Sequence, residues 1–311
     1  MQNKPICFML AAAALAFVAA NPAHAQSART WVSGVGDDFS ATCSRTAPCK
    51  TFAGAISKTT TGGEINCLDP GGFGTLTITK SLTVDCSGTN GNILASGTIG
   101  ITINTDSMSG MIVRLRGLSI NGTLTGSRGI QINGTGTNDN AISIENCVVD
   151  GFTTFGIQNS AKIGRLLVKD TVVRNNFGTA VGVAPAAGNV STVKVTLDNV
   201  STFDSSYGFA FGNGVQAVIK NSIASGHVTG GVEADSGATV SVVSSIIIGN
   251  LTGIVATAGS TIRVRDSDIA GNTTGLSGTV QSHVNNSFLN NGAGGTLTPV
   301  AGGVTDPQGL Q

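Results

Sequence analysis

The feature that most constrains this chain is a repeat. From about residue 110 onward one short pattern recurs: an apolar residue, an outward-facing residue, usually an Asn or Asp, and then a second apolar stretch. The copies begin at Leu115, Ile144, Val168, Leu197, Ile219, Val243, Val264 and Val284. The period is roughly 20 to 30 residues, which indicates a stacked array, because one unit cannot bury its apolar face alone.

The segments within each unit have the character of β-strands. They are short, rich in Val, Ile and Thr, and separated by Gly, Asn and Asp, without apolar residues at helical spacing. Most units also contain a Gly or Ala followed by an apolar residue, such as Gly156-Ile157 and Gly231-Val232. The Leu-x-x-Leu-x-Leu frame of leucine-rich repeats is absent, and a propeller blade needs about 40 residues. The unit therefore predicts one coil of a parallel β-helix, with coils about 4.8 Å apart.

Composition excludes several other classes. Lys and Arg number 17, Asp and Glu also number 17, and the formal net charge is zero. A neutral chain without a basic block is not typical of nucleic-acid-binding proteins. Low charge combined with abundant β-branched residues argues against charge-driven disorder. The 44 glycines do not recur at every third position, which excludes collagen.

Residues 1–25 have the pattern of a secretory signal peptide. Lys4 precedes an apolar run from Ile6 to Ala20, and Ala23-His24-Ala25 follows it. This arrangement predicts cleavage after Ala25. No second long apolar segment follows, so we expect a mature chain without a transmembrane segment. We expect it to be secreted, periplasmic or on the cell surface.

Cysteine usage is consistent with export. The chain has six cysteines, and five remain once Cys7 leaves with the signal peptide, so at least one thiol is unpaired within a monomer. Cys43 and Cys49 flank a short Pro-containing loop and are the best candidates for a disulfide. The sequence has no Cys-x-x-Cys and no His near the cysteines, so we expect no metal site.

Two columns follow from stacking the repeats in register. The Asn/Asp position would form a ladder, because these residues tolerate left-handed turns and their side chains can bond from coil to coil. Its members are Asn146, Asp170, Asn199, Asn221, Asp266 and Asn286. The preceding position would place opposite charges on neighbouring coils, each pair stabilising by about 0.2–1 kcal/mol. Its members are Arg116, Glu145, Lys169, Asp198, Lys220, Ser244 and Arg265.

The N-terminal part resembles a known superfamily. Residues 48–56, PCKTFAGAI, resemble the short amphipathic helix that caps right-handed parallel β-helices. Three segments after it, 62–65, 69–73 and 78–84, resemble the first coils of the pectate-lyase-like (pectin lyase fold) superfamily. The resemblance covers roughly residues 30–291. It implies nothing about activity, because lyases, hydrolases and adhesins share the fold.

The resemblance implies an all-β fold, a single-stranded right-handed parallel β-helix of about ten coils with a short N-terminal capping helix. Residues 26–61 would form the cap and residues 62–291 the β-helix. The Gly/Pro-rich residues 292–311 would form a loosely ordered tail.

The resemblance also bears on the remaining cysteines. In this fold Ile65 and Val84 would lie one coil apart, so Cys67 and Cys86 would stack at a distance suited to a disulfide. Cys147 would be a buried, inert thiol. It would share its column with Leu118, Thr171, Val200 and Ile246.

Known motifs of the superfamily are mostly missing. Sites in the superfamily lie on the strand after the Gly position, and here that strand is mostly uncharged. Its exposed positions are predicted to be Gln158, Gly182, Ala210, Glu233, Val255 and Ser277. Polygalacturonase-type members use an Asn-Thr-Asp and a Gly-His. The chain has both, at residues 104–106 and 226–227, but neither an Asp-Asp pair nor an Arg-x-Lys. Because several coils separate the two matches, we interpret them as coincidence.

One local cluster could carry chemistry, and it comprises Asp204, His227, Glu233 and Asp235. Asp204 and His227 would occupy nearly the same turn on successive coils. Glu233 and Asp235, two apart on a strand, would present carboxyl groups about 7 Å apart, in the range of an inverting glycosidase pair. The alternative interpretation is that exposed acids merely solubilise a turn of low charge.

Two classes of function remain open. The first is a secreted or surface-exposed, non-catalytic β-helix with a structural, adhesin-like or polysaccharide-binding role. The second is a carbohydrate-active enzyme, a polysaccharide lyase or glycoside hydrolase with a site near Asp204–Asp235. We favour the first, because few titratable residues lie on the expected face. We expect a monomer without a cofactor, with a polysaccharide or cell-surface glycan as partner and no nucleic acid.

Overall fold

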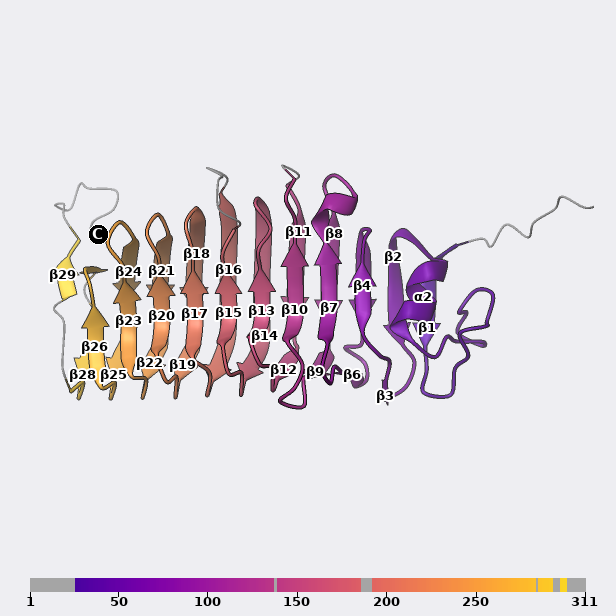
Figure 1. The fold of residues 1–311 in the computed structure, drawn as a ribbon, viewed down its shortest axis with the longest axis horizontal. Coiled ribbons are helices and arrows are strands. Elements are labelled where there is room, and N and C mark those ends of the chain that lie inside the picture. Colours follow the sequence, from indigo (N-terminus) through magenta and orange to yellow (C-terminus); the bar gives the residue numbers. More distant parts are fainter. Residues whose placement is uncertain (1–25, 137–138, 186–191, 284, 293–296, 301–311) are drawn as a thin grey trace, which may run out of the picture.

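The computed structural model describes residues 26–136, 139–185, 192–283, 285–292 and 297–300, so the predicted signal peptide lies outside the described residues. The chain winds into a β-helix whose coils stack along one axis (Figure 1). In Figure 1 the front strands run upward, the chain returns behind them, and the coils advance from right to left. This is a right-handed coil, and the predicted fold class is confirmed.

Each coil contributes one strand to a nine-stranded parallel sheet, and β27 and β28 begin a further turn. The nine strands are β4 (Leu76–Ile78), β7 (Ile99–Asn104), β10 (Arg128–Asn133), β13 (Phe155–Asn159), β15 (Thr179–Val183), β17 (Tyr207–Phe211), β20 (Gly230–Ala234), β23 (Thr252–Ala256) and β26 (Thr274–Ser277). A single turn of 3-10 helix, η1 (Thr105–Ser107), follows β7.

The other strands form a twenty-stranded sheet around the remaining sides of the solenoid. They are β1 (Ser27–Val32), β2 (Thr59–Cys67), β3 (Gly71–Gly72), β5 (Leu82–Asp85), β6 (Gly91–Leu94), β8 (Ile112–Arg116), β9 (Leu118–Asn121), β11 (Ala141–Glu145), β12 (Val148–Asp150), β14 (Gly164–Arg174), β16 (Val193–Phe203), β18 (Val215–Lys220), β19 (Ile223–Ser225), β21 (Thr239–Val243), β22 (Ile246–Ile248), β24 (Thr261–Arg265), β25 (Asp268–Ala270), β27 (Val280–Ser282), β28 (Ser287–Leu289) and β29 (Leu297–Pro299).

The N-terminal end of the solenoid is closed by the predicted short helix, α2 (Phe52–Lys58). Its N-cap is Thr51, whose side chain accepts a hydrogen bond from the backbone N–H of Gly54. Phe52 and Ala55 are buried, and the ring of Phe52 packs edge-on against Phe73 with 5.3 Å between centroids. The helix therefore covers the apolar end of the core with its one apolar face.

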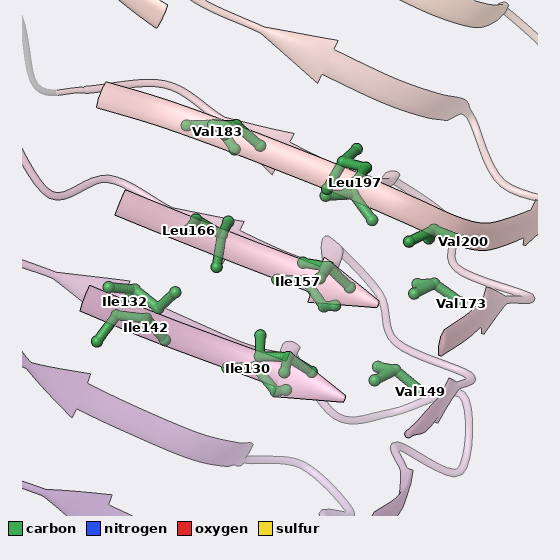
Figure 2. Close-up of a cluster of buried hydrophobic side chains, with 14 of the residues drawn as sticks. Ile130, Ile132, Ile142, Val149, Ile157, Leu166, Val173, Val183, Leu197 and Val200 are labelled. Atoms are coloured by element: carbon green, nitrogen blue, oxygen red, sulfur yellow. The ribbon is translucent and has the colours of Figure 1, made fainter. Parts of the chain in front are cut away.

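The core is a set of aliphatic columns that run along the solenoid axis. Side chains from the nine-stranded sheet, such as Ile130 and Ile157, face those from the other sheet, such as Val149 and Val173 (Figure 2). Burying one such side chain stabilises the fold by about 1.5–3 kcal/mol. One column is fully buried, and it consists of Ile65, Val84, Leu115, Ile144, Val168, Leu197, Ile219, Val242 and Val264.

This register corrects one coil of the predicted repeat. Val242, not Val243, occupies the buried position, because it pairs with Ile219 and Val264. The outward position of that coil is therefore Val243, and the prediction of Ser244 there is wrong. The last predicted start, Val284, lies outside the described residues.

The outward charge column extends further than predicted. From Asp85 onward its members alternate in sign over six coils, because each strand pairs in register with the next. The Arg116 guanidinium contacts carboxylates on both neighbouring coils, Asp85 at 3.8 Å and Glu145 at 3.3 Å. The alternating members are Asp85, Arg116, Glu145, Lys169, Asp198 and Lys220.

The Asn/Asp positions lie at a sharp bend between two strands of the large sheet. Their φ angles of 49–56° are in the left-handed region for Asn146, Asp170, Asn199, Asn221 and Asp266. The Asn199 amide also donates to the Asp170 carboxylate on the preceding coil, at 2.7 Å. Ser244, with a φ of 48°, occupies this position in its own coil.

The sixth predicted position, Asn286, is wrong by one residue. Asn285 has the left-handed φ of 75°, whereas the Asn286 side chain accepts a hydrogen bond from the Ser267 backbone. The cause is one extra residue in the last bend. Val264 pairs with Ser282 before the bend and Asp268 pairs with Ser287 after it, so the later coil has the longer connection.

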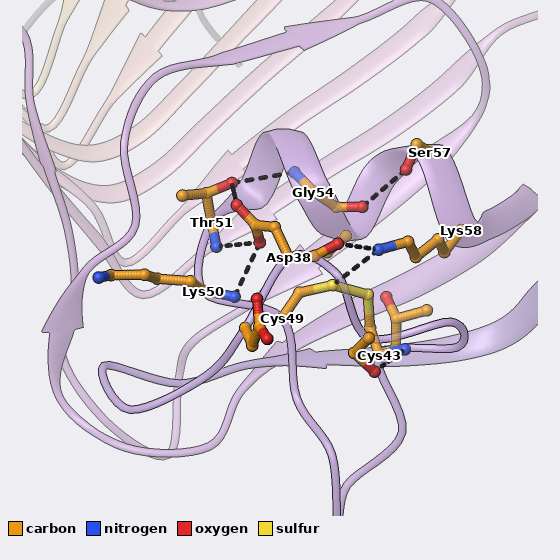
Figure 3. Close-up of a disulfide and its surroundings, with 12 residues drawn as sticks. Asp38, Cys43, Cys49, Lys50, Thr51, Gly54, Ser57 and Lys58 are labelled. Carbon is orange, nitrogen blue, oxygen red and sulfur yellow. Dashed lines mark hydrogen bonds between the residues drawn. A yellow bond between two sulfur atoms is a disulfide. The ribbon is translucent and has the colours of Figure 1, made fainter.

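Both predicted disulfides are present, and Cys147 is free. Cys43–Cys49 braces the loop beside α2 (Figure 3), and Cys67–Cys86 joins the first two coils. The Cys147 side chain is buried and donates to the Glu145 carbonyl, and burial raises its pKa to about 12. The prediction that Ile246 shares the column of Cys147 is wrong. Ser245 lies there, because Ile246 pairs with Ile223 in the next strand.

The C-terminal segment contains one more strand than the sequence predicts. Leu297–Pro299 forms β29, which pairs in parallel with β27, within the region predicted as a loose tail. Among the residues that the structure describes, no helix is long and apolar enough to cross a bilayer.

Candidate functional site

The outward face of the nine-stranded sheet carries the candidate site. Side chains alternate along each strand, so one central residue per coil lies on the outward side of the sheet. These residues stack in register in the order predicted from the sequence. They are Gln158, Gly182, Ala210, Glu233, Val255 and Ser277.

A shallow hollow of about 160 Å³ opens on this face at β13, β15 and β17. Gly182 and Ala210 line it where larger side chains would fill it, with Phe155 and Gln158 on one side and Asp235 on the other. The Phe155 ring lies against Gly182, because a Cβ atom there would be 2.7 Å from Phe155 Cε1. The missing side chain at Gly182 therefore makes room both for the ring and for the hollow.

A second ring lies one coil beyond the hollow. Tyr207, the first residue of β17, lies against Gly230 of the next coil, where a Cβ atom would be 3.1 Å from Tyr207 Cδ1. Its phenol lies near enough to the Glu233 carboxylate for each group to affect the pKa of the other. Burial and the nearby charge of Asp235 raise the pKa of Glu233. Burial and the charges of Glu233 and Asp235 raise the pKa of the Tyr207 phenol.

His227 does not belong to this cluster, and its predicted role is wrong. The side chain points into the solenoid and is 1% exposed. Its Nδ1 accepts the Ser205 backbone N–H at 3.2 Å, and its Nε2 is 3.0 Å from the Thr202 hydroxyl. Burial lowers the pKa of His227 to about 4, so the ring is neutral at pH 7. A ring held inside the core cannot reach a ligand on the outward face.

Asp204 is also separate from the two carboxylates. It lies exposed in the turn before β17, with a left-handed φ of 48°. Asp235 follows the end of β20. Because β17 and β20 are parallel and in register, Asp204 before β17 and Asp235 after β20 lie at opposite ends of the strands. Of the four predicted residues, only Glu233 and Asp235 come together, and Tyr207 joins them.

No protein-family model and no curated protein sequence matches the chain. Solved structures similar to it include a lyase and an epimerase. Pectate lyase Pel9A has a TM-score of 0.51 and 15% identity, over 88% of this chain and 82% of its own. The A-module of the Azotobacter vinelandii mannuronan C-5 epimerase AlgE6 has a TM-score of 0.52 and 18% identity, over 74% of this chain and 67% of its own.

The chain has the pectate-lyase-like β-helix fold. The resemblance inferred from the sequence is therefore confirmed. At these identities the likeness concerns the fold, so any activity has to be argued from the residues of the face.

A polar ladder that was not predicted from the sequence lies inside this pectate-lyase-like β-helix. At one corner of the core, a side chain on each coil accepts the backbone N–H of the coil before it. The ladder consists of Asn176, Ser205, His227, Asn250, Asn272 and Asn291. A polar residue three or four positions before each Gly/Ala-apolar pair was the signal that could have revealed it. His227 is the member of this ladder on its coil.

The Asn-Thr-Asp match is likewise structural in this β-helix. The Asp106 carboxylate accepts backbone hydrogen bonds from Thr135 and Gly136 on the next coil, at 2.7 Å each. These bonds lower the pKa of Asp106. The residue therefore braces the turn between β10 and β11. Among the residues that the structure describes, no group of three His, Cys, Asp or Glu is placed to hold a metal ion.

Proposed function

We propose that this pectate-lyase-like β-helix is an exported protein that binds a polysaccharide along the outward face of the nine-stranded sheet, between β13 and β20. The hollow beside Gly182 and Ala210 is the observation that carries the proposal. Strands on this face are otherwise closely packed and in register. The lining of the hollow, an aromatic ring with several polar groups, is of the kind found in ligand sites. The volume of the hollow is below the roughly 300 Å³ of a pocket that encloses a small molecule, so a ligand would lie across it.

The geometry of the solenoid suits an extended sugar chain. Coils repeat about every 4.8 Å, and one pyranose unit of an extended chain has a comparable length. A chain lying along the axis would meet Phe155 and Gln158 first, then the floor of the hollow, and then Glu233 and Asp235. An amide can both donate hydrogen bonds to sugar hydroxyls and accept them, and a carboxylate can accept them.

The proposal favours binding without catalysis. An enzyme site of this kind gathers acids and bases from several neighbouring coils. Here the titratable groups that meet on the face are Tyr207, Glu233 and Asp235, from β17 and from the end of β20. His227 and Asp204 lie elsewhere.

One observation favours a second candidate function, glycoside hydrolysis. The pKa of Glu233 is raised by burial and by Asp235, which is the property of a general acid beside an ionised partner. Glu233 would protonate the leaving oxygen, and Asp235 would activate water. A polysaccharide lyase fits less well, because it needs a basic group near the sugar. Among the described residues that line the hollow, none is Lys or Arg.

A screen of purified protein 26–311 against neutral, basic and acidic polysaccharides tests both functions. Affinity electrophoresis measures binding, and assays for new reducing ends and unsaturated ends measure cleavage. We expect binding without product. Product that disappears in Glu233→Ala and in Asp235→Ala would establish the enzymatic alternative. Failure to bind any glycan would contradict the proposal.

The disulfides support the export that the proposal includes. Two disulfides are typical of proteins that fold in oxidising compartments. Together with the sequence of residues 1–25, they support an extracellular, periplasmic or surface location. Mass spectrometry of the protein recovered outside the cytoplasm should give an N-terminus at Gln26, and retention of residues 1–25 would contradict this part of the proposal.

A further inference from the structure

The two ends of the candidate face carry opposite charge. At one end, on β10, Arg128 donates through Nε to the Gln158 side chain. At the other end Glu233 and Asp235 lie beside each other. Among the described residues, neither acid forms an ion pair with a Lys or Arg. The end at β20 is therefore an acidic end without a counterion.

The surroundings of the acidic end are partly apolar. Tyr207 lies against Gly230 and near Glu233, and the hollow with the Phe155 ring begins on the adjacent coils. The Glu233 side chain is half-buried. Electrostatic interactions are stronger in such a setting than in open water. A cation placed here would relieve the repulsion between the two carboxylates, and aromatic rings also attract cations.

The same charges disfavour acidic polysaccharides. A polyuronate carries one carboxylate on each sugar, and a carboxylate beside Glu233 or Asp235 would be repelled. Pectate and mannuronan, the polymers in the names of the two similar structures, are of this kind. The charge of this face therefore differs from what such a ligand requires.

We infer that the face selects a glycan with protonated amino groups, such as a glucosamine polymer, and places one ammonium group between Glu233 and Asp235. This inference rests on the proposed function and names its ligand class. The ammonium would donate hydrogen bonds to both carboxylates. The preceding sugar units would then lie over Ala210, Gly182 and Phe155.

The test compares two oligomers that differ in the amino group alone, a β-1,4-linked glucosamine oligomer and its N-acetylated form. Isothermal titration calorimetry on protein 26–311 measures both, beside a polygalacturonate oligomer. We expect the glucosamine oligomer to bind at least about tenfold more tightly than the acetylated one. Its affinity should fall as salt concentration rises, because ions screen the charges.

Three variants locate the effect. Glu233→Gln and Asp235→Asn should each weaken glucosamine binding by about tenfold and leave binding of the acetylated oligomer unchanged. Asp204→Asn is the matched control. It removes one exposed charge at the other end of the strands, at a left-handed position that Asn tolerates. The control should bind as the wild type does. Retained binding of the acetylated oligomer also shows that each variant is folded.

The outcomes separate this inference from the proposed function. Equal or tighter binding of the acetylated or acidic oligomer would overturn the inference while leaving polysaccharide binding intact. Binding of a lysine oligomer as tight as that of glucosamine would also overturn it, because recognition would then be charge alone. No binding of any glycan would overturn both.

Discussion

His227 Nδ1 accepts the backbone N–H of Ser205 on the preceding coil, at 3.2 Å, inside the core of the solenoid. The backbone N–H of His227 in turn donates to the Asn250 side chain on the next coil, at 3.0 Å. The histidine is thus one member of a ladder that is otherwise built mainly from Asn. Its role is to satisfy a buried backbone donor on the coil before it.

This relationship predicts that Asn can replace His227 but an apolar residue cannot. In His227→Asn an amide oxygen can accept the Ser205 N–H, as Asn250 and Asn272 do on their coils. In His227→Leu that donor is left buried without a partner, which costs about 1–3 kcal/mol. Urea denaturation at pH 7 should show the loss in His227→Leu alone. Equal stability of the two variants would contradict the role of His227 in the ladder. Loss of glycan binding in His227→Asn would indicate that His227 belongs to the binding site.

The same histidine predicts a dependence of stability on pH. Its pKa is about 4 in the folded chain and about 6.5 in the unfolded chain, so the unfolded state binds the proton more readily. Stability is therefore fully present above pH 6.5 and is lost as the pH falls toward 4, by about 3 kcal/mol. The difference in unfolding free energy between wild type and His227→Asn, followed from pH 7 to pH 4, isolates this contribution. A difference that stays constant over this range would refute the prediction.

Asn250 should be among the most sensitive buried polar positions. Its side chain accepts from His227 and donates to the Ala224 carbonyl and to Asn272, and it is 2% exposed. We expect Asn250→Ala to lower the free energy of unfolding by about 3 kcal/mol, since several buried bonds are lost together. Asn92→Ala is the control, because Asn92 is exposed and should change stability by no more than about 0.5 kcal/mol. Similar denaturation midpoints for the two variants would show that the ladder contributes little.

Cys147 should react with thiol reagents in the unfolded protein alone. Its sulfur is buried, and burial raises the pKa of the thiol to about 12. In the native state, therefore, a reagent cannot reach the sulfur, and the thiol is not ionised to the reactive thiolate. Labelling followed by intact mass at pH 8 should give no adduct without denaturant and one adduct with it. Cys147→Ser is the control and should give none in either condition. Rapid labelling of the native protein would contradict the predicted burial.

The fold could be predicted from the sequence because the repeat fixes the register. The Gly/Ala-apolar pair placed Gln158, Gly182 and Ala210 in one outward column, and the structure has that column, although Gly182 is buried beneath the Phe155 ring. Errors occurred where one residue changes the register. Val243 is one such residue, since the alternative Val242 is equally apolar, and the extra residue before Asn286 is the other.

The site was harder to predict because it depends on contacts across coils. His227 was assigned to the site wrongly, because the sequence does not indicate whether the side chain of a His in a turn points into the core or out to solvent. Tyr207 was missed, because it lies near Glu233 through the pairing of β17 with β20, and Glu233 is distant from it in the sequence. Such a contact follows from the direction of a side chain and not from spacing along the chain.

Filling the hollow tests the central claim most directly. Ala210→Phe places a ring where the hollow lies, whereas Ser277→Phe places the same ring in the same outward column three coils further on, outside the hollow. We predict that Ala210→Phe weakens binding of the glucosamine oligomer by more than about tenfold, and that Ser277→Phe binds as the wild type does. Calorimetry of the two variants, with thermal unfolding as a check on folding, makes the comparison. Unchanged affinity in a folded Ala210→Phe variant would contradict the claim that this face is the binding site.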